Sequence, residues 1–274
     1  PGMPTLIFLS LGLGSVALAI WLSKNADSDV SSALLESNFA SEGTDPLLEE
    51  LNWDDVEQVD LVGLDIGYGL IPLVNPETGG QLLPRVKGIR KKLSAELGFL
   101  IQPIRIRDDL ELPPDVYHLV MNGVVRGKGE IRIGKEMAIN PGQVHGSLQG
   151  EPTKEPAFGL EALWIDASQR DYARTLGYTV VDSATAIATH LNTLLRNNAP
   201  ELLGHDETQQ LLDKVAAKSP KLVEDLVPAK LPLATVTKVL QNILDDGVSV
   251  RDMRTIIEVL STCLLYTSDA ADDS

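Results

Sequence analysis

The longest apolar run of the chain lies at its start. Residues 1–23, PGMPTLIFLSLGLGSVALAIWLS, carry no charge, and Lys24 is the first charged side chain. A run of this length can cross a hydrocarbon core of about 30 Å, and Trp21 and Lys24 stand where interfacial anchors are expected. A secretory signal peptide is the alternative, but the run lacks a basic n-region and opens with Pro. We therefore predict a transmembrane helix over residues 1–24, the last of several in a longer protein.

The next segment has little hydrophobic periodicity. Residues 25–58 are rich in Ser, Asp and Glu, which is typical of a flexible acidic linker. The linker ends in ELNWDDVEQVD, where Trp53 stands among acidic side chains. Trp53 either packs on the following domain or docks on a neighbouring molecule, and composition alone favours neither.

Strand patterns dominate the segment after the linker. Residues 59–74, VDLVGLDIGYGLIPLV, predict two short apolar strands. Ile104 and Ile106 alternate with arginines, as in a half-buried strand, and the apolar run ALWID predicts another. The segment 81–97 predicts a helix with a basic polar face formed by Arg85, Lys87, Arg90, Lys91 and Lys92.

From residue 183 onward the pattern becomes helical. DSATAIATHLNTLLRNN offers Asp182 or Ser183 as N-cap, and its apolar residues recur on one face. At about 100° per residue, Thr189 points away from that face, so we expect it to be accessible. Further helices are predicted over 206–218 and 235–246 and from residue 253. These patterns predict an α/β body followed by a helical subdomain.

Charge and candidate chemistry narrow the function. With 23 Lys and Arg against 39 Asp and Glu, the net charge is −16, which disfavours binding to nucleic acid. The four histidines are scattered, and GVVRGKGE lacks the spacing of a phosphate loop. We therefore expect no catalytic, metal-binding or cofactor-binding constellation, and the sequence argues against an enzyme.

One aromatic side chain stands in an unexpected place. Phe158 lies in the turn PAFG, directly before the strand run ALWID. Turns face solvent and are usually polar, whereas large apolar side chains usually face a core. Phe158 therefore either plugs the seam between two subdomains or offers a contact to another molecule.

The last twelve residues do not continue the pattern before them. CLLYTSDAADD, starting at Cys263, follows no helical or strand period and ends an amphipathic helix abruptly. One permitted back-translation of this run is a transposase sequencing-library adapter. We interpret residues 263–274 as a non-native tail, which leaves an authentic chain that ends near Thr262.

Several strings together resemble one family. They include GLDIGYGLIPLV, QPIRIRDDLELPP, AINPG, EPAFGLEALWI, VVDSATAIATHLN and LLDKVAAKSPKLVEDLVP. In this order they are similar to the flagellar biosynthesis protein FlhA family, the export gate of flagellar type III secretion. The resemblance covers residues 1 to about 262. It implies a bacterial inner-membrane protein with a cytoplasmic domain that assembles into a homo-oligomeric ring.

The resemblance also implies how the chain divides. The last membrane helix and the linker precede an α/β subdomain formed by 59–133 and 183–202. A β-rich subdomain, 134–182, is inserted into it, and a truncated helical subdomain, 203–262, follows. The implied partners are export chaperones with bound flagellar cargo and other proteins of the export apparatus.

The resemblance also implies roles for residues of this chain that match the family's motifs. A chaperone-docking groove falls on Glu155, Phe158 and Thr189, and Glu155 replaces the family's Asp by a side chain one methylene longer. A linker motif that docks on an adjacent subunit falls on Glu50, Trp53 and Asp55. Two alternatives stay open: the homologous export gate of a virulence injectisome, and a membrane-anchored enzyme or sensor domain.

Overall fold

The computed structural model describes residues 59–272 of the chain. The predicted transmembrane helix 1–24 and linker 25–58, with Glu50, Trp53 and Asp55, lie outside the described residues. Within the described part, no helix is both long enough and apolar enough to cross a membrane.

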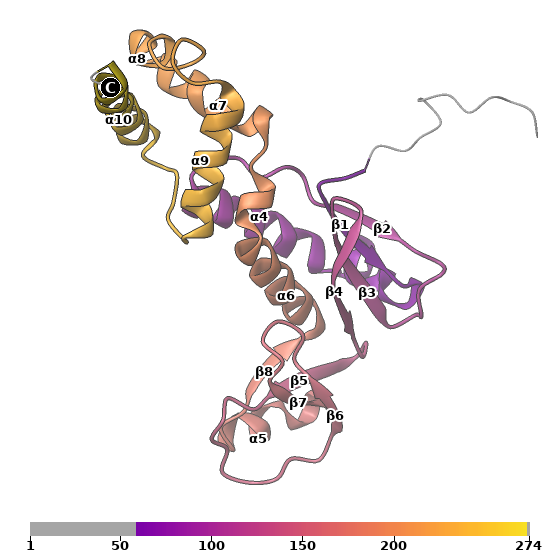
Figure 1. The fold of residues 1–274 in the computed structure, drawn as a ribbon. Coiled ribbons are helices and arrows are strands. Elements are labelled where there is room, and N and C mark those ends of the chain that lie inside the picture. The colour runs from indigo at the N-terminus through magenta and orange to yellow at the C-terminus, as the bar shows by residue number, and fades with distance from the viewer. Residues whose placement is uncertain (1–58, 273–274) are drawn as a thin grey trace, which may run out of the picture. The chain divides into compact units, whose positions relative to one another are not determined.

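The first part of the described chain forms a four-stranded mixed sheet (Figure 1). Its strands are β1 (Val62–Ile66), β2 (Arg105–Asp108), β3 (Val116–Met121) and β4 (Val124–Glu130), in the order β2-β1-β3-β4. β1 and β2 are parallel, with helix α4 (Leu82–Leu97) in their crossover, and the other neighbours are antiparallel. Asn122 and Gly123 join β3 to β4 with positive φ at both positions, as a type I′ hairpin turn requires.

The segment after β1 is helical, although its apolar pattern predicts a second strand. It forms three short pieces, η2 (Tyr68–Leu70), α3 (Ile71–Val74) and η3 (Pro76–Thr78). Pro72 lies in the first turn of α3, where its missing N–H costs no helical hydrogen bond. In a central strand the same proline would remove a ladder hydrogen bond. The prediction of two strands over residues 59–74 is therefore wrong for the second strand.

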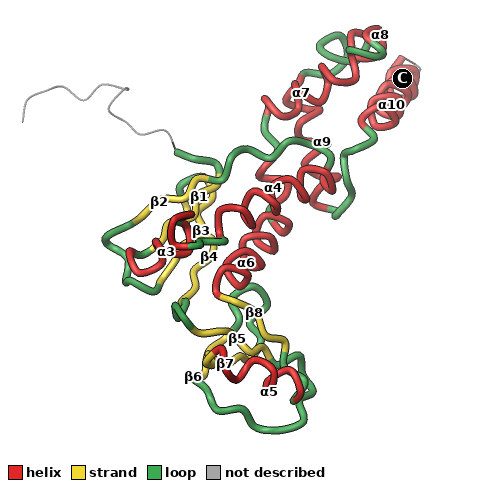
Figure 2. Tube along the Cα trace, turned by 180° about the vertical axis from the view of Figure 1, so that it is seen from behind, coloured by secondary structure: helices red, strands yellow, loops and turns green. Residues whose placement is uncertain are grey.

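A second four-stranded sheet is entirely antiparallel. It contains β5 (Lys135–Ile139), β6 (Glu151–Lys154), β7 (Glu161–Asp166) and β8 (Thr179–Asp182), in the order β6-β7-β5-β8. The run ALWID lies in β7, as its pattern predicts. η4 (Ala167–Gln169) and α5 (Arg170–Thr175) follow β7, and α5 contacts β5 and β8 (Figure 2). A small core of Ala138, Leu148, Ile165 and Ala173 lies in this region.

Helix α6 (Ser183–Asn197) connects the second sheet to the rest of the core. Of the two N-cap candidates, Asp182 caps the helix, since its carboxylate accepts a hydrogen bond of 2.7 Å from the Thr185 N–H. α6 runs beside α4 (Figures 1 and 2) and contacts β4, β5 and β8. Ile187, Leu191 and Leu195 of its apolar face are completely buried. One helix thus supports both sheets.

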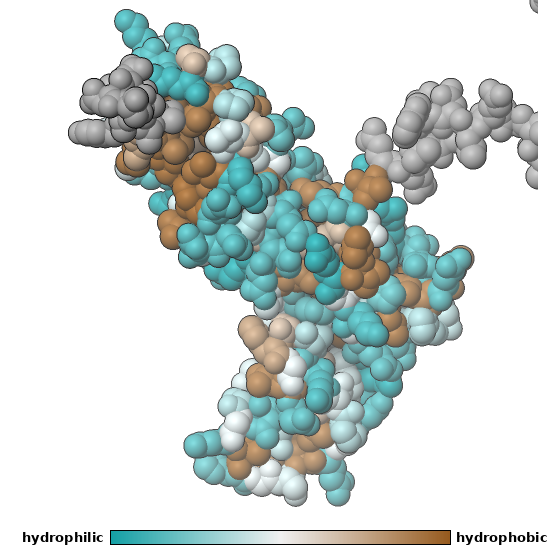
Figure 3. Space-filling model, in the orientation of Figure 1, coloured by the Kyte–Doolittle hydropathy of each residue, from teal (hydrophilic) through white to brown (hydrophobic). Residues whose placement is uncertain are grey.

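Helices alone form the last part of the described chain. They are η5 (Ala199–Leu202), α7 (His205–Ala216), α8 (Pro220–Glu224), α9 (Leu233–Asp245) and α10 (Met253–Asp272). The visible face in Figure 3 is mostly hydrophilic, with apolar surface gathered over α9. As the sequence predicts, a mixed α/β part comes first in the described chain, and a part made of helices follows it.

α10 differs from its prediction at its C-terminal end. The pattern predicts that this helix ends near Thr262, but α10 continues to Asp272. Residues 263–272 contain neither Pro nor Gly, and Leu and Ala are strong helix formers. The helix propensity of these residues thus extends α10 beyond the end of its apolar pattern. The predicted helix end near Thr262 is therefore wrong.

Candidate functional site

The turn between β6 and β7 presents Phe158 to solvent. Its side chain is 67% exposed, so Phe158 is not a buried plug between subdomains. Gly159, directly after it, has a φ of +70°, which lets the chain reverse here at little cost. Leu160, also exposed, follows the glycine. The turn therefore holds an aromatic ring and an aliphatic side chain at the surface.

Glu155 closes this turn from within. Its carboxylate oxygens accept hydrogen bonds of 2.9 and 2.8 Å from the N–H groups of Ala157 and Phe158. Its own N–H donates to the carbonyl of Leu160, and its carbonyl accepts from Gly159 N–H, both at 2.8 Å. The side chain is only 2% exposed. The family resemblance implies that the Glu155 carboxylate lines a groove. In the structure the carboxylate instead points into the turn and binds its backbone N–H groups.

Two buried polar side chains from different elements lie near this carboxylate. Tyr117 on β3 and His190 on α6 share a hydrogen bond of 2.8 Å between the hydroxyl and Nδ1. Their rings meet edge to face, with centroids 5.8 Å apart. Burial, and then the nearby Glu155 charge, raises the pKa of Tyr117. Burial lowers the pKa of His190, while Glu155 acts in the opposite direction. The Glu155 charge thus acts on both members of the hydrogen-bonded pair.

Two glycines on β4 make room for this pair. A Cβ at Gly129 would lie 2.5 Å from the Tyr117 hydroxyl oxygen, and one at Gly127 would lie 2.9 Å from His190 Nε2. Contacts this short essentially never occur for real Cβ atoms. Gly127 and Gly129 of GVVRGKGE therefore accommodate buried side chains. Alternate glycines in a strand pattern signal a close approach, but not which residue approaches.

Thr189 lies on α6 directly before His190. It is partly buried rather than fully accessible. The neighbouring residue, His190, is the one whose pKa the Glu155 charge raises against the effect of burial. Of the three predicted docking residues, Phe158 is exposed, Thr189 is partly buried and Glu155 is buried.

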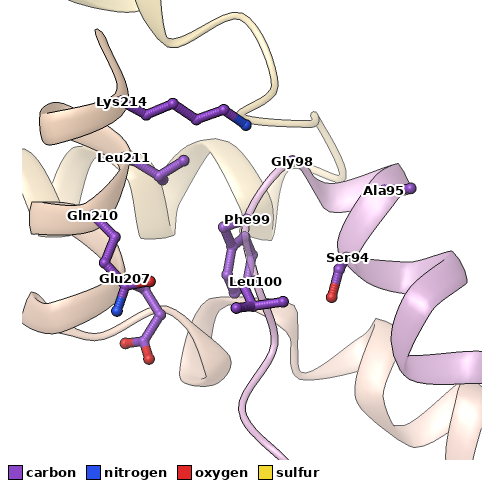
Figure 4. Close-up of a pocket in the computed structure, with 9 residues that line it drawn as sticks. All are labelled: Ser94, Ala95, Gly98, Phe99, Leu100, Glu207, Gln210, Leu211 and Lys214. Carbon is purple, nitrogen blue, oxygen red and sulfur yellow. The ribbon is translucent and has the colours of Figure 1, made fainter. Parts of the chain in front are cut away.

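A second surface feature lies between α4 and α7 (Figure 4). It is a hollow of about 330 Å³ with an apolar floor that includes Phe99, Leu100 and Leu211, and Lys214 extends over it. An adjoining hollow of similar volume shares Gly98, Leu211 and Lys214 and adds Lys218, Arg251 and Arg254. We call these two hollows the basic groove. Glu207 and Asp252 also line it, so cations outnumber acids in a partly apolar surface.

The basic face of α4 is only partly free. Arg85 pairs with Asp182 at 2.8 Å, and Arg90 donates to the carbonyl of Ile101 at 2.7 Å. Lys92 pairs with Glu96 at 3.9 Å. These contacts give part of this cationic face an intramolecular role.

Solved structures with the same fold define the class. The cytosolic domain of EscV from the type III secretion system matches with a TM-score of 0.55 and 18% identity, over 76% of this chain and 60% of that one. The Chlamydia pneumoniae CdsV protein matches with a TM-score of 0.65 and 22% identity, over 78% of this chain and 63% of that one. This chain therefore has the fold of a cytosolic domain of the type III secretion class.

Sequence relatives specify the family. The chain belongs to the FHIPEP family, whose model matches residues 1–272. It is 45% identical to the flagellar biosynthesis protein FlhA of Escherichia coli over 269 residues, which is 98% of this chain and 38% of that protein. The FlhA of Caulobacter vibrioides is 37% identical, over 98% of this chain and 38% of that protein. The chain thus spans less than two fifths of these relatives.

Proposed function

We propose that this chain is part of a docking platform of a flagellar type III protein export gate. Its task in that platform is to bind export chaperones that carry flagellar cargo, without catalysing a reaction. The observation that supports this most directly is Phe158, a large aromatic ring held outward by a hydrogen-bonded turn. An exposed ring on a rigid turn loses little conformational entropy on binding, which suits a recognition contact.

The proposed contact combines Phe158 with its surroundings. We propose that Leu160, which is also exposed, adds apolar area to the contact and that the partly buried Thr189 on α6 adds a hydroxyl. A small apolar contact with a polar edge gives modest affinity, around micromolar. Reversible binding of this strength suits a platform that must release its cargo.

Binding of a purified export chaperone with its flagellar cargo tests this proposal. In the full chain, Phe158→Ala should abolish binding, and Thr189→Met should do the same by placing a larger side chain at the contact. Tyr172→Ala is the matched control, because Tyr172 is 58% exposed on α5 and has no part in the proposed contact. Normal binding by Phe158→Ala would refute the docking role, and so would loss of the folded state in that variant.

Ring assembly is the second part of the proposal, and the basic groove supports it. The linker motif around Glu50, Trp53 and Asp55 joins an aromatic ring to acidic side chains, and the groove offers apolar floor and cations. We therefore propose that the linker of one subunit docks in the groove of the next. EPEC SctV-C, whose solved structure has a TM-score of 0.56 to this chain, is nonameric.

The remaining assignments rest on the family. We propose that residues 1–24 form the last membrane helix of an inner-membrane protein and that the rest faces the cytoplasm. The subdomain boundaries near residues 133, 182 and 202 are part of the same proposal. Identity of 45% to a flagellar relative, against 18% to EscV, supports the flagellar branch over a virulence injectisome.

A further inference from the structure

We propose that Glu155 is a positioning residue, which holds Phe158 for docking and does not itself touch the partner. This inference rests on the proposed docking function and assigns Glu155 a different part in it. A groove-lining role would require its carboxylate to face the partner, whereas the structure turns both oxygens toward backbone N–H groups.

The hydrogen bonds of the turn converge on this one residue. The two ends of the turn are joined by Glu155 N–H to the Leu160 carbonyl, and Gly159 N–H closes on the Glu155 carbonyl. The carboxylate binds the two N–H groups between them, those of Ala157 and Phe158. Hydrogen bonds to an ionised acceptor are about twice as strong as neutral ones. The Glu155 carboxylate therefore holds the backbone N–H of Phe158, the residue that carries the exposed ring.

Burial makes a direct contact with a partner incompatible with this arrangement. Only 2% of Glu155 is exposed, against 67% of Phe158 three residues later. A partner could reach the carboxylate only after the turn opened and both N–H groups lost their acceptor. Opening would leave two donors without partners, which is costly wherever they stay buried. The partner should therefore meet the outer side of the turn.

The same carboxylate relates the turn to α6. Its charge acts on both Tyr117 and His190, and His190 precedes Leu191 and follows Thr189 on that helix. The 2.8 Å hydrogen bond between Tyr117 and His190 fixes the helix side of this arrangement. The hydrogen bonds of Glu155 itself stay within the turn, so the residue it positions is Phe158.

A double-mutant cycle separates positioning from contact. Glu155→Gln preserves the shape of the side chain but keeps one acceptor oxygen, so one of the two N–H groups loses its partner. It is measured in the full chain with native Phe158 and with Phe158→Leu, using a purified export chaperone with its flagellar cargo. We expect Glu155→Gln to weaken chaperone binding about tenfold when residue 158 is the native Phe. In the Phe158→Leu background the same change should weaken binding less than about twofold. An equal loss in both backgrounds would show direct contact and overturn the proposal.

A measurement without any partner tests the same idea independently. Amide hydrogen exchange at Ala157 and Phe158 should accelerate in Glu155→Gln, while the β7 amides keep their native rates. Glu161→Gln, an acid-to-amide change at an exposed position of β7, should alter neither. Unchanged exchange at Ala157 and Phe158 in Glu155→Gln would overturn the positioning role. If Phe158→Leu binds the chaperone as tightly as the native chain, the docking function fails, and the exchange result still decides what Glu155 does.

Discussion

At the scale of single residues, Gly129 shows how an absent side chain shapes the interior near the candidate site. A Cβ there would meet the hydroxyl and ring of Tyr117 at 2.5–2.6 Å, and Tyr117 is completely buried. We expect Gly129→Ala to lower the free energy of unfolding by about 1–3 kcal/mol, because the buried ring must move. Chemical denaturation measures this change.

A second glycine provides the control for that substitution. Gly88 lies in α4 with open space around the position of a Cβ. Gly88→Ala should therefore raise the free energy of unfolding by about 0.5–1 kcal/mol, through helix propensity alone. Equal effects of the two substitutions would contradict the steric explanation for Gly129.

His190 makes stability depend on pH in a defined direction. Burial lowers its folded-state pKa below the ordinary 6.5, with Glu155 partly opposing the shift. Between the folded and unfolded pKa values the unfolded chain binds more protons, so stability falls as the pH drops through that range. Below the folded pKa this contribution levels off.

The comparison with His190→Gln isolates this contribution from that of the carboxylates. Gln cannot titrate, and it can still share a hydrogen bond with the Tyr117 hydroxyl. The loss of melting temperature between about pH 7.5 and pH 5.5 should be smaller in His190→Gln than in the native chain. An identical loss in both would show that His190 does not titrate in this range.

At the scale of elements, α10 combines a packed first part with a second part that we interpret as non-native. Met253 and Ile257 are buried in the main core. Deleting residues 263–274 should change the melting temperature by less than about 2 °C. Ile257→Ala, which removes a fully buried side chain, should cost about 2–5 kcal/mol. A deletion as damaging as Ile257→Ala would contradict the interpretation of the tail.

Elements also show where local patterns suffice. The apolar stripe of α6 predicts the helix, and the cap candidates Asp182 and Ser183 predict its start to within one residue. The apolar run ALWID predicts β7. The second strand expected over residues 59–74 does not form, because an apolar run with glycines and Pro72 suits short helical turns as well as a strand. Periodicity over so few residues cannot separate the two.

At the scale of the whole molecule, the proposed linker docking predicts how assembly responds to mutation. Burial of an aromatic side chain contributes about 2–3 kcal/mol, enough to bias ring contacts. Trp53→Ala should therefore weaken ring formation by the full-length protein, and so should Leu100→Ala, which truncates a side chain of the basic groove that is 60% exposed. Crosslinking or electron microscopy measures ring occupancy.

The control for this prediction is another exposed leucine. Leu110 is 79% exposed, between β2 and β3, and does not line the groove. Leu110→Ala should leave ring occupancy unchanged. If Trp53→Ala assembles as well as the native protein, the linker does not hold the ring together.

The sequence alone determined the family, the mixed α/β class and the positions of the amphipathic helices. These properties depend on ordered motifs and on local periodicity, which neighbouring residues carry by themselves. The sequence also singled out Phe158, because a large aromatic in a Pro-Gly turn is unusual whatever surrounds it.

The tertiary structure alone decided what surrounds Phe158. Tyr117 and His190 meet across 73 positions of sequence, and Gly127 and Gly129 have a purpose only because those two side chains lie against β4. The direction of the Glu155 carboxylate was equally undetermined, since the same side chain at a turn can face solvent or the backbone. Burial and hydrogen bonding depend on which distant elements approach, and local sequence patterns do not contain that information.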